Sequence, residues 1–188
     1  MEENLFIYKS LSKFAIKEPL CNPITTCLMM DVIKAASYIF KRYQDEMKEK
    51  IDEMKLHKLL YFAQREAIIQ TGSPLFDAQF AAWKYGPVIV EVRNCYRANS
   101  LNVFPTEQEL VPYKAAFDYV FKNYAVKDSW TLSMLTHGES SWKNARAGYG
   151  VDDHCDVLID TSDITKDAER MKVRRFYFEN ISPKLQES

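Results

Sequence analysis

Apolar residues recur at helical spacing along most of the chain after residue 30, and this pattern predicts a series of amphipathic helices. The clearest pattern fills residues 53–71, between Asp52 as a candidate N-cap and Gly72 as a candidate C-terminal glycine. The apolar stripe of this segment is broad, so we expect a helix near the centre of the fold. The stripe consists of Leu56, Leu59, Leu60, Ala63 and Ala67, widened by Phe62 and Ile69, while charge is confined mostly to Glu53, Lys55, Lys58, Arg65 and Glu66.

Residues 76–92, FDAQFAAWKYGPVIVEV, allow two interpretations. The run VIVEV favours a strand by propensity alone. A strict two-residue alternation is absent, however, and the apolar residues from Val88 to Tyr96 lie on one face of a helix. We therefore predict a helix that begins with Pro87 at its first position and runs to about Arg97, preceded by a short extended segment near residues 78–86.

Further helices are predicted on both sides of these segments. Asp31 is a candidate N-cap for a helix that reaches about Tyr43. Thr106 and Glu109 have the spacing of a capping box within a linker at residues 98–112. The remaining predictions are a helix over 113–124, a short helix over 128–138 capped by Asp128 or Ser129 and stopped by Gly138, one helical turn after it, and a last helix capped by Thr161 or Ser162 with the stripe Ile164, Ala168, Met171 and Phe178.

These elements predict a mainly α fold: a compact, single-domain helical bundle of about six to eight helices. With only five glycines and seven prolines in 188 residues, few positions break regular structure. The helical domain is expected over residues 31–180. Residues 1–30 are interpreted as an N-terminal arm with one short amphipathic segment, and residues 181–188 as a C-terminal tail.

Charge and composition narrow the classes of function. Lys and Arg number 25 against 26 Asp and Glu, so the net charge of −1 gives no overall attraction to nucleic acid. The run MKVRRFY at 171–177 is a local basic patch or a solvated helix face. Charges interrupt every apolar stretch before the roughly 20 residues that a membrane span needs. No secretion signal or C-x-x-C pair is evident, which predicts a cytoplasmic protein with reduced thiols.

The histidines and cysteines are the candidate reactive groups of the sequence. His154 and Cys155, flanked by aspartates, have metal-ligand character, but one short loop rarely closes a four-ligand site. Cys95 could pair with His57 or His137 as a nucleophile, or be a small apolar residue of its helix.

Structural explanations are available for both of these histidines. We expect His57 to pair with Glu53 or Tyr61 along the helix, and a partly positive His137 to complement the C-terminal dipole of its helix. No phosphate-binding loop, dinucleotide fingerprint or G-x-S-x-G motif occurs. We therefore expect no enzyme activity, no catalytic residue, no cofactor and no metal.

Four residues around the Gly-Pro pair are candidates for contact with a partner. Trp83 and Tyr85 precede the pair, and Arg93 and Arg97 follow one helical turn apart. Aromatic and arginine side chains of this kind dominate many protein interfaces. The alternative is that the two rings fill the core where two helices meet, with Gly86 and Pro87 as the elbow.

The segments KLHKLLYFAQREAIIQTGSPLFDAQFAAWKYGPVIVEVRNCYR and LSMLTHGESSWKNAR resemble the SocA-like antitoxin family, whose domain is called Panacea and was earlier described as phage-associated and GepA-like. Ser141 stands where the family often has proline. The motif positions are Lys55, Leu59, Leu60, Tyr61, Phe62, Gly72, Pro74, Leu75, Phe76, Gly86, Pro87, Val88, Leu135, His137 and Trp142.

The resemblance implies a helical, non-enzymatic antitoxin, often carried by a prophage or mobile element, that neutralises a toxin by direct protein contact. The partner is then a toxin encoded by an adjacent gene, with a cellular protease as a second partner if the protein is a proteolytic adaptor. Membrane and nucleic-acid partners are not expected. Two alternatives stay open: a hydrolase that uses Cys95 or the His154 loop, and a phage-associated DNA-binding regulator.

Overall fold

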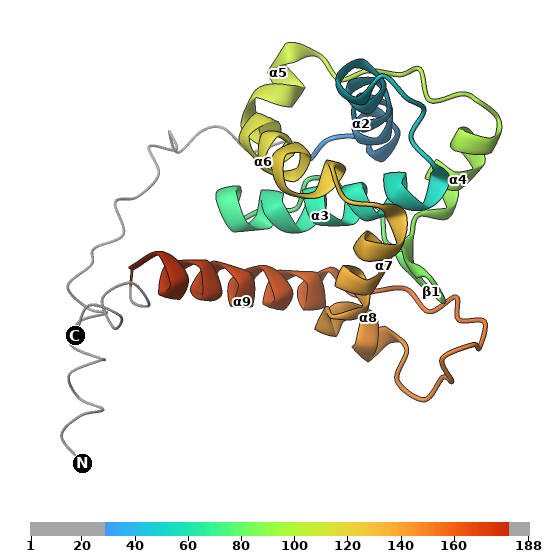
Figure 1. Ribbon diagram of the computed structural model, residues 1–188, viewed down its shortest axis with the longest axis vertical. Coiled ribbons are helices and arrows are strands. Elements are labelled where there is room, and N and C mark those ends of the chain that lie inside the picture. The colour runs from blue at the N-terminus through green and yellow to red at the C-terminus, as the bar shows by residue number, and fades with distance from the viewer. Residues whose placement is uncertain (1–28, 181–188) are drawn as a thin grey trace.

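The structure, a computed structural model, describes residues 29–180 and is mainly α-helical (Figure 1). The expected tail at 181–188 and residues 1–28 of the expected arm lie outside the described residues. Helix α3 (Glu53–Thr71) runs through the middle. On one side of it lie α2 (Val32–Met47), α5 (Glu107–Leu110) and α6 (Lys114–Val120), and on the other side lies α9 (Thr161–Asn180).

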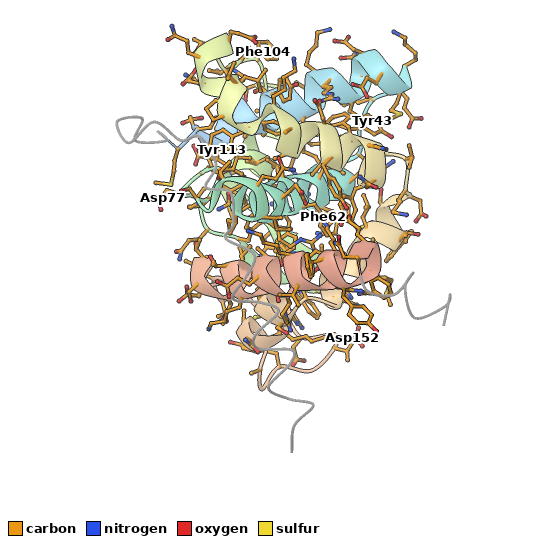
Figure 2. The ribbon with its side chains drawn as sticks, turned by 90° about the vertical axis from the view of Figure 1, so that its left-hand side faces the viewer. Tyr43, Phe62, Asp77, Phe104, Tyr113 and Asp152 are labelled. Carbon is orange, nitrogen blue, oxygen red and sulfur yellow. The ribbon has the colours of Figure 1, made fainter. Side chains whose placement is uncertain are left out.

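The layers meet along α3. Helices α7 (Ser129–His137) and α8 (Ser140–Ala145) close one end of the bundle, next to a two-stranded sheet (Figure 1). Figure 2 shows side chains filling the space between the layers, with Tyr43 and Phe104 at one end of the view and Asp152 at the other. None of the helices in the described part of the chain is long and apolar enough to cross a membrane.

Helix α3 is buried on nearly all of its surface, because it touches α2, α6, α7, α9 and the second strand. The predicted central position is therefore right. The predicted polar side is not: Lys58, Arg65 and Glu66 are each only 1% exposed. A helix enclosed by neighbours has no solvent side on which to place its charges, so each of them needs a partner inside the protein.

Several predicted helix ends are confirmed. The side chains of Asp31, Asp52 and Asp128 accept backbone N–H groups of α2, α3 and α7. Gly72 ends α3 with φ 76°, and Thr106 and Glu109 form the predicted capping box of α5. Short polar motifs thus fixed the helix boundaries locally, because the capping groups lie within three residues of the amides that they satisfy.

The predicted helix start at Pro87 is wrong. Residues Gly86–Val88 form strand β2, which pairs antiparallel with β1 (Ala81–Trp83), and helix α4 (Val90–Arg97) begins only after Ile89. The extended segment predicted near 78–86 is present and continues to Val88. A positive φ of 102° at Gly86 closes the hairpin, a geometry that favours glycine.

Three other details differ from prediction. Helix α9 follows Asp160, whose side chain accepts the N–H of Ser162, so Asp160 caps it in place of Thr161 or Ser162. In its stripe Ile164 and Ala168 are buried, whereas Phe178 is exposed. The helix predicted at 113–124 is composite: a 3₁₀ turn (η1, Val111–Tyr113), α6 and a π-helical turn (η2, Phe121–Ala125).

Candidate functional site: a pocket beside the hairpin

A pocket of about 630 Å³ lies where the start of α3, the β1–β2 hairpin, α4 and the segment 152–154 meet. This volume is within the range of small-molecule sites. Its lining consists of Glu53, Met54, His57, Lys58, Trp83, Lys84, Tyr85, Val88, Arg93, Arg97, Asp152, Asp153 and His154. The four residues predicted to contact a partner are all among them, so the structure brings these side chains together.

Trp83 is held by contacts inside the molecule. Its indole N–H donates to Asp156 Oδ1 at 2.9 Å, and the Arg93 guanidinium lies 5.0 Å from its ring centroid. Its backbone carbonyl accepts the indole N–H of Trp142 at 3.0 Å. Trp83 is half-buried and lies outside the hydrophobic core cluster, so the interpretation of this ring as a core plug is wrong.

Tyr85 lies farther out, at the tip of the hairpin, and is 48% exposed. Its ring packs edge-on against Trp130, with 5.5 Å between the ring centroids. Trp130 and Met134, one turn apart on α7, are 62% and 67% exposed. We call Tyr85, Trp130 and Met134 the aromatic ridge. The α7 half of this ridge was not predicted, although Trp130 and Met134, four residues apart, are apolar positions outside the buried stripe.

Arg93 and Arg97 share one carboxylate that sequence analysis did not assign to the site. Arg93 Nε donates to Glu53 Oε1 at 3.1 Å, and Arg97 Nε donates to Glu53 Oε2 at 2.9 Å. The Arg97 side chain is 57% exposed, so its ion pair with Glu53 contributes little to stability. The pocket rim therefore carries more positive than negative charge at this point.

Lys58 lies at the pocket floor and is 1% exposed. Its ammonium donates to the carbonyl of Pro87 at 3.0 Å, which ties α3 to strand β2. Burial lowers the Lys58 pKa to about 7, and the charge of Asp52 acts in the opposite direction. No ion pair with a carboxylate is formed by Lys58 among residues 29–180.

His57 also lies at the pocket floor and does not form the predicted pairs with Glu53 or Tyr61. Its Nδ1 accepts the backbone N–H of Ile89 at 3.4 Å, so the neutral ring carries its proton on Nε2. Burial and the nearby charges of Lys58 and Arg93 lower the His57 pKa to about 3, which keeps the ring neutral. The Nε2 atom is buried and has no hydrogen-bond partner in the described structure.

His137 does not carry the partial charge that the sequence predicted. Its ring stacks on Trp142 with 4.1 Å between centroids, and desolvation, with the charges of Lys58 and Arg146, lowers its pKa. A hydrogen bond with the backbone of Lys84 acts in the opposite direction. The neutral imidazole is therefore a packing partner of Trp142.

The two motif segments meet at the hairpin. Four hairpin carbonyls accept side-chain donors: Ala82 from Arg146 (3.0 Å), Trp83 from Trp142 (3.0 Å), Tyr85 from Ser133 (2.9 Å) and Pro87 from Lys58 (3.0 Å). Helix α3 and the α7–α8 region thus fix the backbone on which Trp83 and Tyr85 stand.

The other motif residues surround this arrangement. Leu59, Leu60, Tyr61, Phe62, Leu75 and Phe76 are buried in the core. Lys55 donates to Tyr43, and the carbonyl of Pro74 accepts the hydroxyl of Tyr113. Leu135 is an exception, with 41% of its surface exposed.

Cys95, Cys155 and His154 do not come together in a reactive cluster within the described residues. Cys95 packs against the core, and Cys155 is buried with its thiol near the Ala145 carbonyl. His154 Nε2 lies 3.0 Å from Asp156 Oδ2 at the surface. Over the described range, no three His, Cys, Asp or Glu side chains gather to hold a metal ion.

Comparison with known proteins identifies the motif region. Residues 56–143 match the family described as "Antitoxin SocA-like, Panacea domain", which confirms the resemblance seen in the sequence. A 49-residue segment is 45% identical to Antitoxin SocA of Caulobacter vibrioides (strain NA1000 / CB15N) and covers 26% of this chain and 26% of that protein. The chain thus matches about a quarter of this relative's length. No solved structure matches the chain.

Proposed function

We propose that this protein, with its Panacea domain at residues 56–143, is the antitoxin of a two-gene system and neutralises a toxin protein by direct contact. Its partner is the product of an adjacent gene, in the cytoplasm, and its own gene lies in a prophage or mobile element. The match to an antitoxin family supports the class of function. The similarity to Antitoxin SocA supports it too.

The observation that carries the proposal is the aromatic ridge. Tyr85, Trp130 and Met134 form an exposed apolar surface on a well-fixed backbone. Tyrosine and tryptophan are the residue types that contribute most to binding energy at protein interfaces. Rigid rings lose little conformational entropy on binding, which favours their use as anchors.

The four residues predicted to contact a partner divide into two groups in this proposal. Tyr85 and Arg97 are exposed and contact the toxin. Trp83 and Arg93 position them: Trp83 is fixed by Asp156 and Trp142, and Arg93 lies against Trp83 and Glu53. A charged rim around an apolar centre is the usual composition of a protein interface.

The experiment is co-expression with the adjacent gene product, read out as growth rescue and as affinity by calorimetry. We expect the double variant Tyr85→Ala/Trp130→Ala to weaken binding by about 2–4 kcal/mol, or roughly 30- to 1,000-fold, and to lose rescue. The matched control is Val173→Ala/Phe178→Ala, which removes two exposed apolar side chains from α9. Equal affinity of the double variant and the wild type would refute the proposed surface.

The fate of the toxin distinguishes the two modes of neutralisation. If the protein blocks the toxin, toxin abundance stays unchanged on co-expression and the complex can be isolated. If the protein delivers the toxin to a cellular protease, toxin abundance falls in wild-type cells and recovers when the protease is removed. Failure of every adjacent gene product to bind the purified protein would refute the antitoxin proposal itself.

A further inference from the structure

We propose that the pocket beside the hairpin binds a small organic molecule that carries a carboxylate or phosphate group, with His57 and Lys58 as hydrogen-bond donors to that group. This inference does not depend on the toxin-binding proposal, because its hydrogen-bond donors are His57 and Lys58 on the pocket floor, although Tyr85 belongs both to the pocket wall and to the aromatic ridge. It assigns a ligand site to a domain whose family description names none.

His57 has a hydrogen-bond donor that no described residue uses. Since Nδ1 accepts the Ile89 N–H, the ring presents Nε2–H as a donor, and this atom has no partner in the described structure. Buried polar atoms in native proteins are almost always hydrogen-bonded. A buried donor without a partner, on a residue that lines a pocket, indicates a place for an acceptor atom of a ligand.

The Lys58 ammonium has an incomplete set of hydrogen-bond acceptors among the described residues. An ammonium group has three donors, and the described residues supply one acceptor, the Pro87 carbonyl at 3.0 Å. The charge is almost fully buried and lacks a counter-ion. An anionic ligand group would supply both the missing acceptors and the missing negative charge.

The charged side chains that line the pocket include more positive than negative groups. Lysines 58 and 84 and arginines 93 and 97 face the carboxylates of Glu53, Asp152 and Asp153. Glu53 is shared by both arginines, and Asp152 is paired with Lys84 at 2.7 Å. Asp153 accepts the backbone N–H of Gly150. The positive charges thus exceed the available negative ones, which favours an anion over a cation.

The size and walls of the pocket define the remainder of the ligand. A volume of about 630 Å³ accommodates a metabolite and is much larger than a lone phosphate ion needs. The side chains of Met54, Trp83, Tyr85 and Val88 supply apolar and aromatic surface. We therefore expect an acidic group attached to an apolar or aromatic body.

Protonation of Lys58 should be coupled to binding. The ionisable groups around this amine are Asp52, which is the N-cap of α3, His57 on α3 and His137 on α7, and both histidines have lowered pKa values. Among these groups around the amine, Lys58 itself is the one whose pKa, about 7, lies between pH 6 and pH 8. A bound anion stabilises the ammonium form, so affinity should rise as the pH falls.

The test uses the purified full chain with benzoate and phenyl phosphate as probes and benzamide as the matched neutral probe. Calorimetry and thermal denaturation are run at constant ionic strength. We expect saturable binding of at least one anionic probe, no binding of benzamide, and benzoate affinity about tenfold higher at pH 6 than at pH 8. No saturable binding of either anion up to 10 mM, or equal affinity for benzoate and benzamide, would overturn the inference.

Variants locate the binding. Lys58→Met removes the amine and leaves an unbranched side chain that is one atom shorter, and we expect it to lower affinity for the anionic probe at least tenfold. The control Lys166→Met alters an exposed lysine of α9 and should bind as the wild type does. If Lys58→Met does not fold, the pH dependence in the wild type decides: affinity that does not change between pH 6 and pH 8 would reject Lys58 as the donor. Unchanged affinity in a folded Lys58→Met would do the same.

Discussion

Helix α3 carries two buried polar clusters that differ in how completely their groups are paired. In its middle, the Tyr61 hydroxyl lies 2.8 Å from Ser141 Oγ, and Arg65 binds Glu139 and Tyr124. The Glu66 carboxylate accepts two hydrogen bonds from Arg175, from Nη1 to Oε1 at 2.9 Å and from Nη2 to Oε2 at 2.8 Å. We call this the paired cluster. Near the start of the same helix, His57 and Lys58 keep donors without partners.

Burial of a polar side chain therefore does not by itself show whether that side chain serves packing or binding. The paired cluster joins α3 to α8, α9 and the η2 turn, and only Arg65 Nε in it lacks a partner among the described residues. Such a network fixes how helices pack. His57 and Lys58 fix the hairpin with one hydrogen bond each and leave their other donors at a pocket, as expected for a binding site.

The largest effect is expected in the network around Tyr61. Asp167 is 2% exposed and accepts the N–H groups of Ser140 and Ser141, the Tyr61 hydroxyl and Arg170. Asp167→Ala leaves the backbone N–H groups of Ser140 and Ser141 without this acceptor, and it removes one partner of the buried Tyr61 hydroxyl. We expect the free energy of unfolding, measured by urea denaturation, to fall by about 3–5 kcal/mol.

The control for this variant is Glu169→Ala, which changes an exposed acidic residue on the same helix. We expect a change within about 0.5 kcal/mol for it, as is usual for surface substitutions. A loss below about 1 kcal/mol in Asp167→Ala would show that this network of hydrogen bonds contributes little to the packing of α8 and α9.

The next largest effect concerns Gly86 in the hairpin. A Cβ at this position would lie 2.6 Å from Thr136 Oγ1 and 2.7 Å from Lys58 Cε, with φ at 102°. Gly86→Ala combines backbone strain with overpacking, so we expect a loss of about 2–4 kcal/mol in unfolding free energy. Gly148 has φ 89° and open space around it, so Gly148→Ala isolates the strain, at about 1 kcal/mol. Equal losses of unfolding free energy in the two variants would show that the close contact with Lys58 does not add to the cost of Gly86→Ala.

The smallest effect is the pH dependence contributed by His57. Its pKa is about 3 in the folded protein and 6.5 in the unfolded chain, so the unfolded chain binds more protons between these values. Stability from this group is complete above pH 6.5 and is lost as the pH falls, by about 1 kcal/mol per pH unit between pH 6 and pH 4. His57→Gln, which keeps an acceptor for the Ile89 N–H, should show a shallower loss in urea titrations at each pH. Parallel pH profiles for the two proteins would contradict the burial of a neutral His57.

Local signals made much of the fold predictable. The Asp52 cap, the Gly72 end of α3 and the Thr106 capping box involve residues within a few positions of each other, so the sequence contains the whole interaction. The hairpin was misread because pairing of Ala81 with Val88 and tethering by Lys58, Ser133 and Trp142 are non-local. Without those contacts, the apolar positions after Pro87 fit a helix equally well.

The candidate site was predictable in part for the same reason. Residue type alone singled out Trp83, Tyr85, Arg93 and Arg97, and the structure brings all four to one pocket. The burial of His57 and Lys58 was not predictable, because an isolated helix pattern does not show that neighbouring elements enclose the helix. Trp130 was missed because its neighbour Tyr85 lies 45 positions away along the sequence.

The pocket wall at 152–154 is the part of the pocket in which relatives with the same helices can differ. This wall lies beyond residue 143, where the family match ends, and it is anchored by the bridge of Leu158 to Ala81 and the bond from the Ala82 N–H to the Val157 carbonyl. The segment thus lies outside the matched range and is held to the hairpin by these contacts. A homologue with the same helices and a different segment here would have a different pocket wall. Chimeras in which residues 147–157 are exchanged can therefore transfer ligand preference while the remainder of the domain stays the same.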